Sequence, residues 1–428
     1  MTFSRPVVPL LVPDLPDRHA LMPYLERMDE ARQYSNFGPL AVDLERQLAR
    51  IFSDRAGAPV HVTTVSSATL GLELALCSMG LAPGSRVLVP AFTFVATATA
   101  VIRAGFLPVI ADIDEESWML TPAIADAAFE VEPFEAALPV AAFGQPHPAG
   151  AWEEFSRRRG IPVLIDAAGA YGSQWAGAGA GVSIVFSLHT TKSLPAGEGG
   201  LVVSADDEFI RQVRQRSNFG INLDKTRPVA VGLTDMLGTN AKLSEYHAAV
   251  GLASLARWAE RAAVRRSLME RIVVALDAAS HPAGSQASSI VWQGPAAIAA
   301  PTLLCVRWPG AGLADELEQE CARQGVMTRR WYQPLLHLHP LAEGCARHLP
   351  TPTADRLASE LIGLPFFPDM TEAQIALLAD CVTRVARGAQ VATAAQSKIR
   401  RGRKSPDHRT PAEATTDSTI EPFSHGHS

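Results

Sequence analysis

The chain of 428 residues is poor in cysteine and in long apolar runs, and each shortage excludes a class of protein. Its five cysteines are scattered and form no CxxC pair, so we expect reduced thiols, no disulfide framework and no metal site. No run of about 18 apolar residues occurs, so no membrane-spanning helix is expected. The N-terminal stretch is broken by prolines and lacks the apolar core and cleavage site of a signal peptide, which predicts a cytoplasmic protein.

Charge is also scarce, since charged residues make up 19% of the chain and the net charge is −6. A negative balance argues against a nucleic-acid-binding surface. The length and the 47% hydrophobic content predict a globular protein with two or more domains. The predicted divisions are an N-terminal arm (1–30), a large domain (31–262), a small C-terminal domain (263–390) and a disordered basic and polar tail (391–428).

Lysine is scarce as well, because the chain has five and the other 33 of its 38 basic residues are arginine. The first is Lys192, in a short loop of small and hydroxyl residues between two apolar runs, 182–188 and 200–203, that predict buried strands. An ε-amine can form an imine with an aldehyde, whereas a guanidinium cannot. Lys192 is therefore a candidate Schiff-base lysine, and the alternative is a lysine that caps a carbonyl or pairs with a carboxylate.

Apolar runs alternate with helical periodicity over the first 260 residues. This alternation predicts an α/β fold with a mostly parallel sheet covered by helices. The irregular stretch 218–239 is long enough to be functional or mobile. Other predicted elements are helices at 122–137 and 149–160 around a strand at 140–143, strands at 300–308 and 325–331 around a helix at 313–324, a strand at 364–368 and a closing helix at 370–387.

Three more features lie where predicted strands end. Small hydroxyl residues at 66–69, before a helix, provide backbone N–H groups for a phosphate, although plain N-capping is the commoner use of such a turn. Asp166 ends the apolar strand 161–165 and either faces a ligand or caps the next helix. Phe94 follows another strand. Together with Lys192 these features suit pyridoxal 5′-phosphate (PLP), which needs a phosphate site, an aromatic face, an amine and a carboxylate for its pyridine nitrogen.

Seven motifs follow one another along the chain: SSATLGLELAL (66–76), VLVPAFTFVAT (87–97), DAAGAYGS (166–173), FSLHTTKSLPAGEGG (186–200), GTNAKLSEYHAAVGL (238–252), WYQPLLH (331–337) and LPFFPDMT (364–371). In this order they resemble the DegT/DnrJ/StrS family of sugar aminotransferases, which are fold-type I PLP enzymes. The resemblance covers most of residues 30–385. It implies a large domain with a mostly parallel seven-stranded sheet between helices and a smaller C-terminal α+β domain.

Position by position, the resemblance implies two catalytic residues and a set that binds the cofactor. Lys192 would form the Schiff base with PLP and shuttle the proton of the amino donor, and Asp166 would pair with the pyridine nitrogen. The residues that would hold the phosphate or stack on the ring are Ala68, Thr69, Phe94 and Ser187.

Asn240 would reach the phosphate of the neighbouring subunit's cofactor, so the resemblance implies a homodimer with shared active sites. Weaker candidates for substrate contact, for which packing or solvation is an equal alternative, are Glu198, Arg330, Tyr332 and His337. A diphosphate would need a positively charged approach, which Arg329, Arg330 or Lys242 could supply, unless they are solvated or paired with carboxylates.

Two positions depart from the family pattern. Gly169 stands where the family usually has Gln or His near the phenolic oxygen of the cofactor, and Ala68 stands where glycine is frequent. Neither change removes the chemistry. Lys192 favours transamination, because the dehydratase branch of the family has histidine at this position.

The sub-pattern NFGI followed by GTNAK is similar to enzymes that act on nucleotide-linked 4-keto-6-deoxyhexoses. The implied function is PLP-dependent transamination of such a nucleotide sugar, with glutamate as the amino donor, for a polysaccharide or a glycosylated metabolite. Two alternatives stay open. One is a catalytically inactive regulator that binds PLP or a sugar nucleotide, which Gly169 alone favours; the other is a PLP sugar enzyme with another reaction.

Overall fold

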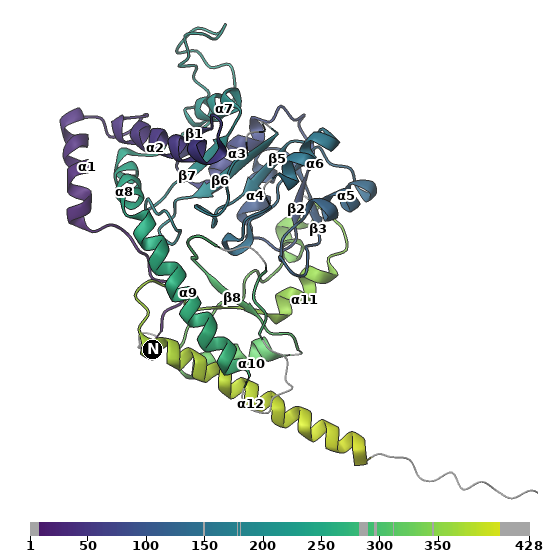
Figure 1. The fold of residues 1–428 in the computed structure, drawn as a ribbon. Coiled ribbons are helices and arrows are strands. Elements are labelled where there is room, and N and C mark those ends of the chain that lie inside the picture. The colour runs from purple at the N-terminus through teal and green to yellow at the C-terminus, as the bar shows by residue number, and fades with distance from the viewer. Residues whose placement is uncertain are drawn as a thin grey trace, which may run out of the picture.

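The computed structural model describes residues 8–148, 150–177, 179, 181–281, 290–294, 298–310, 312–344 and 346–402, with side chains only as far as residue 391. A large unit is built on a central sheet, and a smaller unit lies at one end of the long helix α9 (Trp258–Ser280) (Figure 1). Within the described ranges, no helix is both long and apolar enough to cross a membrane.

The central sheet has eight strands in the order β1-β7-β6-β5-β4-β2-β3-β9. β7 runs antiparallel to both of its neighbours, and every other pair is parallel, so the predicted mostly parallel sheet is confirmed. The strands are β1 (His61–Val65), β2 (Arg86–Pro90), β3 (Leu107–Ala111), β4 (Ala136–Ala137), β5 (Val163–Asp166), β6 (Val182–Ser187), β7 (Gly200–Ser204) and β9 (Arg347–His348). Seven of them come from the predicted large domain, and the two-residue β9 adds an eighth at the edge.

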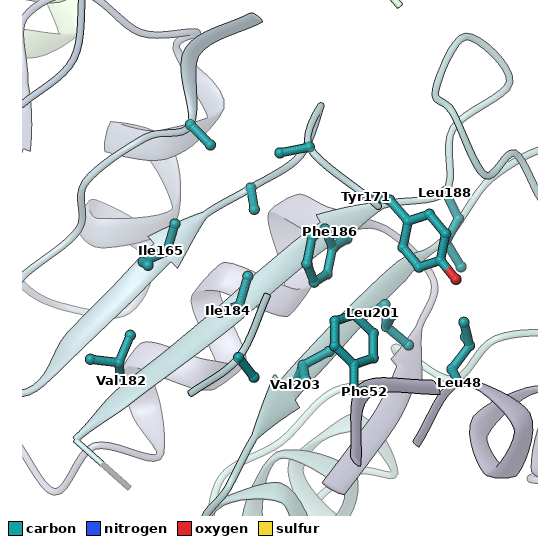
Figure 2. Packing of buried hydrophobic residues seen from close by; sticks show 14 of the residues in the cluster. Leu48, Phe52, Ile165, Tyr171, Val182, Ile184, Phe186, Leu188, Leu201 and Val203 are labelled. Atoms are coloured by element: carbon teal, nitrogen blue, oxygen red, sulfur yellow. The ribbon is translucent and has the colours of Figure 1, made fainter. Parts of the chain in front are cut away.

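Helices cover both faces of this sheet because its strands are apolar on both sides. Ile184 and Phe186 of β6 point to one face, where they pack with Leu48 and Phe52 of α2 (Figure 2), whereas Val185 packs into the other. The first face is covered by α2 (Pro39–Ala56), α5 (Pro122–Val131), α6 (Ala151–Arg159) and α8 (Glu245–Ala256). The second is covered by α3 (Ala68–Cys77), α4 (Ala96–Arg103), α7 (Asp207–Ser217) and α11 (Pro352–Glu360). Helix α1 (Arg18–Ala31) lies against α8.

The small unit has its own core around an antiparallel pair of strands, β8 (Leu304–Arg307) and β10 (Leu361–Leu364). Helices α9, α10 (Leu313–Arg323) and α12 (Glu372–Gly402) pack around this pair. Val8 is fully buried in the same core and pairs with Val326. Val8, which lies within the predicted N-terminal arm, is therefore part of the small unit.

Several predicted boundaries were wrong. The helix predicted at 122–137 ends at Val131, because Pro133 forces Glu132 into an extended conformation, and β4 follows. The strand predicted at 140–143 is instead a single bridge at Val140 and a 3-10 turn. Residues 325–331 form only isolated bridges. The last strand is β10, before the predicted 364–368, and α11 was not predicted.

Part of the predicted disordered tail is helical. Helix α12 continues through residues 391–402, which were predicted to be disordered. This part of the chain is rich in alanine, the residue with the highest intrinsic helix propensity. The rest of the predicted tail, 403–428, lies outside the described residues.

Candidate active site

Asp166 is the buried carboxylate at the carboxyl end of β5, with 6% of its surface exposed. Its Oδ2 accepts a hydrogen bond of 2.8 Å from the Thr97 hydroxyl, and its Oδ1 accepts one of 3.2 Å from the amide of Ala168. The Thr97 hydroxyl lies 2.9 Å from that of Thr93. Burial raises the pKa of Asp166, whereas the Thr97 hydroxyl, the Ala168 amide and the charge of Lys192 oppose this rise.

Lys192 lies in the loop between β6 and β7, where its amide donates to the carbonyl of His189 at 2.9 Å. Burial lowers the pKa of the Lys192 amine, and the carboxylate of Asp166 opposes the shift. Within the described part of the chain the amine makes no hydrogen bond and no ion pair at contact distance. The alternative in which Lys192 caps a carbonyl or pairs with a carboxylate therefore finds no support.

The turn between β1 and α3 lies at the same edge of the sheet, because Val65 pairs with Gly200 and Gly200 pairs with Ser187. Ser67 caps α3 by accepting a hydrogen bond of 3.2 Å from the amide of Leu70. The first amides of the helix, including those of Ala68 and Thr69, have no partner within the helix and suit an anion. The capping and the phosphate predictions for this turn are therefore compatible.

Two neighbours hold this turn in place. The amide of Ser66 donates to the carbonyl of Ala241 at 2.7 Å. Gly200 of β7 lies directly against the turn. A Cβ atom at this position would lie 2.7 Å from the Ala68 nitrogen. Any residue other than glycine at position 200 would displace the turn that the phosphate needs.

The other predicted cofactor residues lie around this edge. Phe94 follows β2, and its ring is 51% exposed, three residues before Thr97. Ser187 ends β6, and its hydroxyl accepts a hydrogen bond of 3.3 Å from the amide of His189. Asn240 precedes Ala241, so its backbone lies beside the turn of its own chain, and its side chain accepts a hydrogen bond of 2.7 Å from Lys242.

The weaker substrate candidates make different contacts in the structure. Glu198 is exposed and pairs with His189 at 3.6 Å. His337 pairs with Asp355 at 3.4 Å and stacks on His348, and burial lowers its pKa. Arg330 pairs with Asp315 of α10 and donates to the carbonyl of Ser359 of α11. His337 and Arg330 are thus each paired with a carboxylate of the chain.

Tyr332, by contrast, is brought to the site. Its ring stacks on Phe143 at 5.3 Å with an interplanar angle of 6°, and it meets Phe92 edge-on at 5.2 Å. Burial raises the pKa of the Tyr332 phenol, and the charge of Asp166 adds to this rise. Tyr332 and Asp166 therefore lie within electrostatic reach of each other.

Sequence reasoning missed Thr93, Thr97 and Phe143. The threonines are four residues apart, but Thr93 lies before α4, so their contact is made by the turn that leads into the helix and helical spacing does not account for it. No sequence pattern indicated Phe143, because it lies in a 3-10 turn with a φ of 55° that local residue types do not predict.

Gly169 lies against Gly144 in this turn. Gly144 has a φ of +90°, and a Cβ atom there would come within 2.8 Å of the Gly169 carbonyl oxygen. A Cβ atom on Gly169 itself would meet the Gly144 nitrogen at 3.5 Å, an ordinary contact. The backbone therefore does not exclude the larger residue that stands here in the family.

These residues fit PLP. The unpaired amine of Lys192 suits an aldehyde, and the buried Asp166 has an incompletely used carboxylate for a pyridine nitrogen. The turn supported by Gly200 offers helix amides for a phosphate, and the exposed ring of Phe94 offers an aromatic face.

Comparisons with known proteins agree with this arrangement. A model of the DegT/DnrJ/EryC1/StrS aminotransferase family matches residues 17–383. "Protein Rv3402c" of Mycobacterium tuberculosis (strain ATCC 25618 / H37Rv) is 30% identical over 386 residues, which are 87% of this chain and 88% of that protein.

Two solved structures have a similar fold. DesI, crystallised in the presence of its TDP-sugar product, superposes with a TM-score of 0.76 at 28% identity, over 92% of this chain and 96% of its own. DesV of S. venezuelae, in complex with a ketimine intermediate, has a TM-score of 0.73 at 28% identity, over 88% of this chain and 99% of its own. Both matches extend over the large and the small unit.

Proposed function

Because the chain belongs to the DegT/DnrJ/EryC1/StrS aminotransferase family, we propose that it transfers an amino group from glutamate to a nucleotide-linked keto sugar. Its enzyme class and fold are those of the PLP-dependent aminotransferases. The sugar proposed is a 4-keto-6-deoxyhexose, on the pattern of NFGI (218–221) followed by GTNAK (238–242). The observation that carries the proposal is the unpaired amine of Lys192 within electrostatic reach of the buried Asp166.

PLP, when bound, supplies an aldehyde that condenses with amines and a ring that accepts electrons. Lys192 would hold it covalently and afterwards move the proton between the donor carbon and the cofactor. Asp166, kept in place by Thr97, would hold the proton on the pyridine nitrogen. The first amides of α3 would bind the phosphate, and Phe94 would cover the ring.

The proposal includes a homodimer. Residues 218–239 extend away from the sheet beside α7 (Figure 1) and expose several apolar side chains. The most exposed is Leu237, at 90%. An exposed apolar segment of this kind favours association, and Asn240 at its base would then reach the phosphate site of the second subunit. Gel filtration with light scattering tests the dimer, and a monomer with full activity would contradict it.

An absorbance spectrum before and after adding glutamate tests the proposed chemistry. The PLP-loaded protein should be yellow, and glutamate should bleach this band as the cofactor takes up the amino group. The bleached protein, freed of glutamate, should turn yellow again with a nucleotide-linked 4-keto-6-deoxyhexose. A yellow protein that glutamate leaves unchanged would instead favour the regulator, and a colourless one would remove Lys192 from its role.

A further inference from the structure

Arg329 and Arg330 are adjacent in sequence but differ in their partners. The Arg330 guanidinium pairs with Asp315 of α10 at 2.5 Å and donates to the carbonyl of Ser359 at 2.7 Å. It therefore holds α10 against α11. Within the described residues, the Arg329 guanidinium has no hydrogen bond and no carboxylate partner. It stacks on an aromatic ring instead.

That ring belongs to Trp331 and forms a platform under the charge. The guanidinium carbon of Arg329 lies 4.1 Å from the centre of the ring. Gly363 packs closely against this ring, because a Cβ atom on Gly363 would lie 2.4 Å from Trp331. The backbone of Arg329 is fixed too, because it exchanges two hydrogen bonds of 3.0 and 2.7 Å with Gly363. A guanidinium stacked in this way keeps its N–H groups free for an oxyanion.

The platform adjoins the candidate active site through a row of rings. Trp331 meets Tyr332 at 5.8 Å between ring centres, and Tyr332 meets Phe92 at 5.2 Å. Phe92 directly precedes Thr93, whose hydroxyl contacts the Thr97 that holds Asp166. Both Asp166 and Arg329 also influence the Tyr332 phenol, the first raising its pKa and the second lowering it.

We infer that Arg329 is the residue of the small unit that binds an oxyanion of the substrate, a carboxylate or a phosphate, while Arg330 has a structural role. This inference rests on the proposed function and deepens it. Two substrate groups share the required chemistry: the carboxylate of the amino donor and the diphosphate of the nucleotide sugar. The geometry predicts a bidentate contact that neither lysine nor a neutral side chain can replace.

Calorimetry on the PLP-loaded protein tests the assignment with two unreactive probes, glutarate for the carboxylate and inorganic pyrophosphate for the diphosphate. Arg329→Met should weaken the binding of at least one probe roughly 10- to 100-fold, as expected for the loss of a charged hydrogen-bonded pair. Arg330→Met is the matched control, and it should lower the melting temperature without changing either affinity.

The pattern of losses identifies the source of the anion. Loss of glutarate alone assigns Arg329 to the donor, loss of pyrophosphate alone assigns it to the nucleotide, and loss of both makes the site common to the two. Unchanged affinities in Arg329→Met, an equal loss in Arg330→Met, or a wild type that binds neither probe overturns the assignment. The glutamate bleaching of the same samples is read separately, so a failure of the proposed function is recognised on its own.

Discussion

Two buried carboxylates, Asp166 and Glu245, show how a working acid differs from a structural one. Glu245 begins α8 and is completely buried, and its two oxygens accept hydrogen bonds of 2.7 and 2.8 Å from the amides of Leu40 and Ala41. It thereby caps the first turn of α2. Asp166 is almost as buried, but one oxygen accepts only a hydroxyl and the other only a longer contact to an amide.

The two carboxylates differ in the kind of hydrogen-bond donor that each accepts from. Both oxygens of Glu245 have a short bond to a helix terminus, where the free amides and the dipole stabilise a negative charge. Asp166 accepts the same number of hydrogen bonds, but from one hydroxyl and from a more distant amide that does not belong to a helix terminus. Burial alone therefore does not identify a functional acid; the donors that a buried carboxylate accepts from distinguish the two.

The largest effect should come from Lys192→Ala. Removing the amine leaves no group to hold the cofactor covalently or to move the donor proton, so turnover should fall at least about a thousandfold. PLP should still bind, but loosely. Single-turnover bleaching by glutamate measures the loss, with the exposed Lys225→Ala as the control, and retained turnover in Lys192→Ala would refute the assignment.

Asp166→Asn sharpens the comparison, because it keeps the shape and removes the charge. The pyridine nitrogen would lose its anionic partner, and turnover should fall by roughly 10²- to 10⁴-fold, within the range for a proton-holding group. The melting temperature should stay close to that of the wild type, because burial raises the pKa of Asp166 and its charge is not needed for folding. A variant as active as the wild type would show that Asp166 is a second structural acid.

Glu245→Gln is the opposite test. The amides of Leu40 and Ala41 would lose a charged acceptor, and stability should fall by about 1.5–3 kcal/mol. The remaining folded protein should turn over normally, so activity per mole of bound PLP should not change. The melting temperatures of the two variants are measured side by side. A lower value for Asp166→Asn than for Glu245→Gln would contradict the assignment of Glu245 as the structural acid.

Thr97→Val removes the hydroxyl that supports Asp166 and nearly preserves the side-chain volume. One neutral-to-charged hydrogen bond is worth about 1.5 kcal/mol, so turnover should fall about tenfold. The absorption band of bound PLP should also change with pH differently from that of the wild type, because the carboxylate becomes a poorer partner. A purely packing role for Thr97 predicts an unchanged pH dependence.

The smallest effect concerns pH. Burial holds the pKa of Lys192 below its ordinary value of 10.5, so the PLP-free folded state binds fewer protons there than the unfolded chain. The cost of burying the ammonium is therefore complete below the lowered pKa and disappears as the pH rises from there to the ordinary value of 10.5. Lys192→Met lacks this cost, and its advantage in melting temperature over the PLP-free wild type should shrink between pH 7 and pH 10.

Lys192 and Asp166 could be predicted from sequence because each stands at the end of an apolar run, where a polar residue has few structural reasons to be. The two adjacent arginines could not be separated, since the partner of Arg330 is Asp315 and that contact exists only after the small unit has folded. The end of α5 was predicted wrongly for a local reason, because the predicted helix was continued through Pro133, whereas this proline ends the helix and β4 follows. Thr97 of α4 was missed because its role depends on Asp166, which ends β5 and lies 69 residues further along the chain.

The N-terminal segment has a consequence for the ancestry and engineering of this architecture. Val8 pairs with residues 325–327 and Leu10 accepts from the amide of Phe366, both in the small unit, before the chain enters the large one at α1. The small unit is therefore completed by a segment from the opposite end of the polypeptide. Recombination between relatives at a single crossover after α9 would join a small unit to a foreign N-terminal segment. Chimaeras of this family should survive only when both pieces are exchanged together, so the two segments are expected to be inherited as one module.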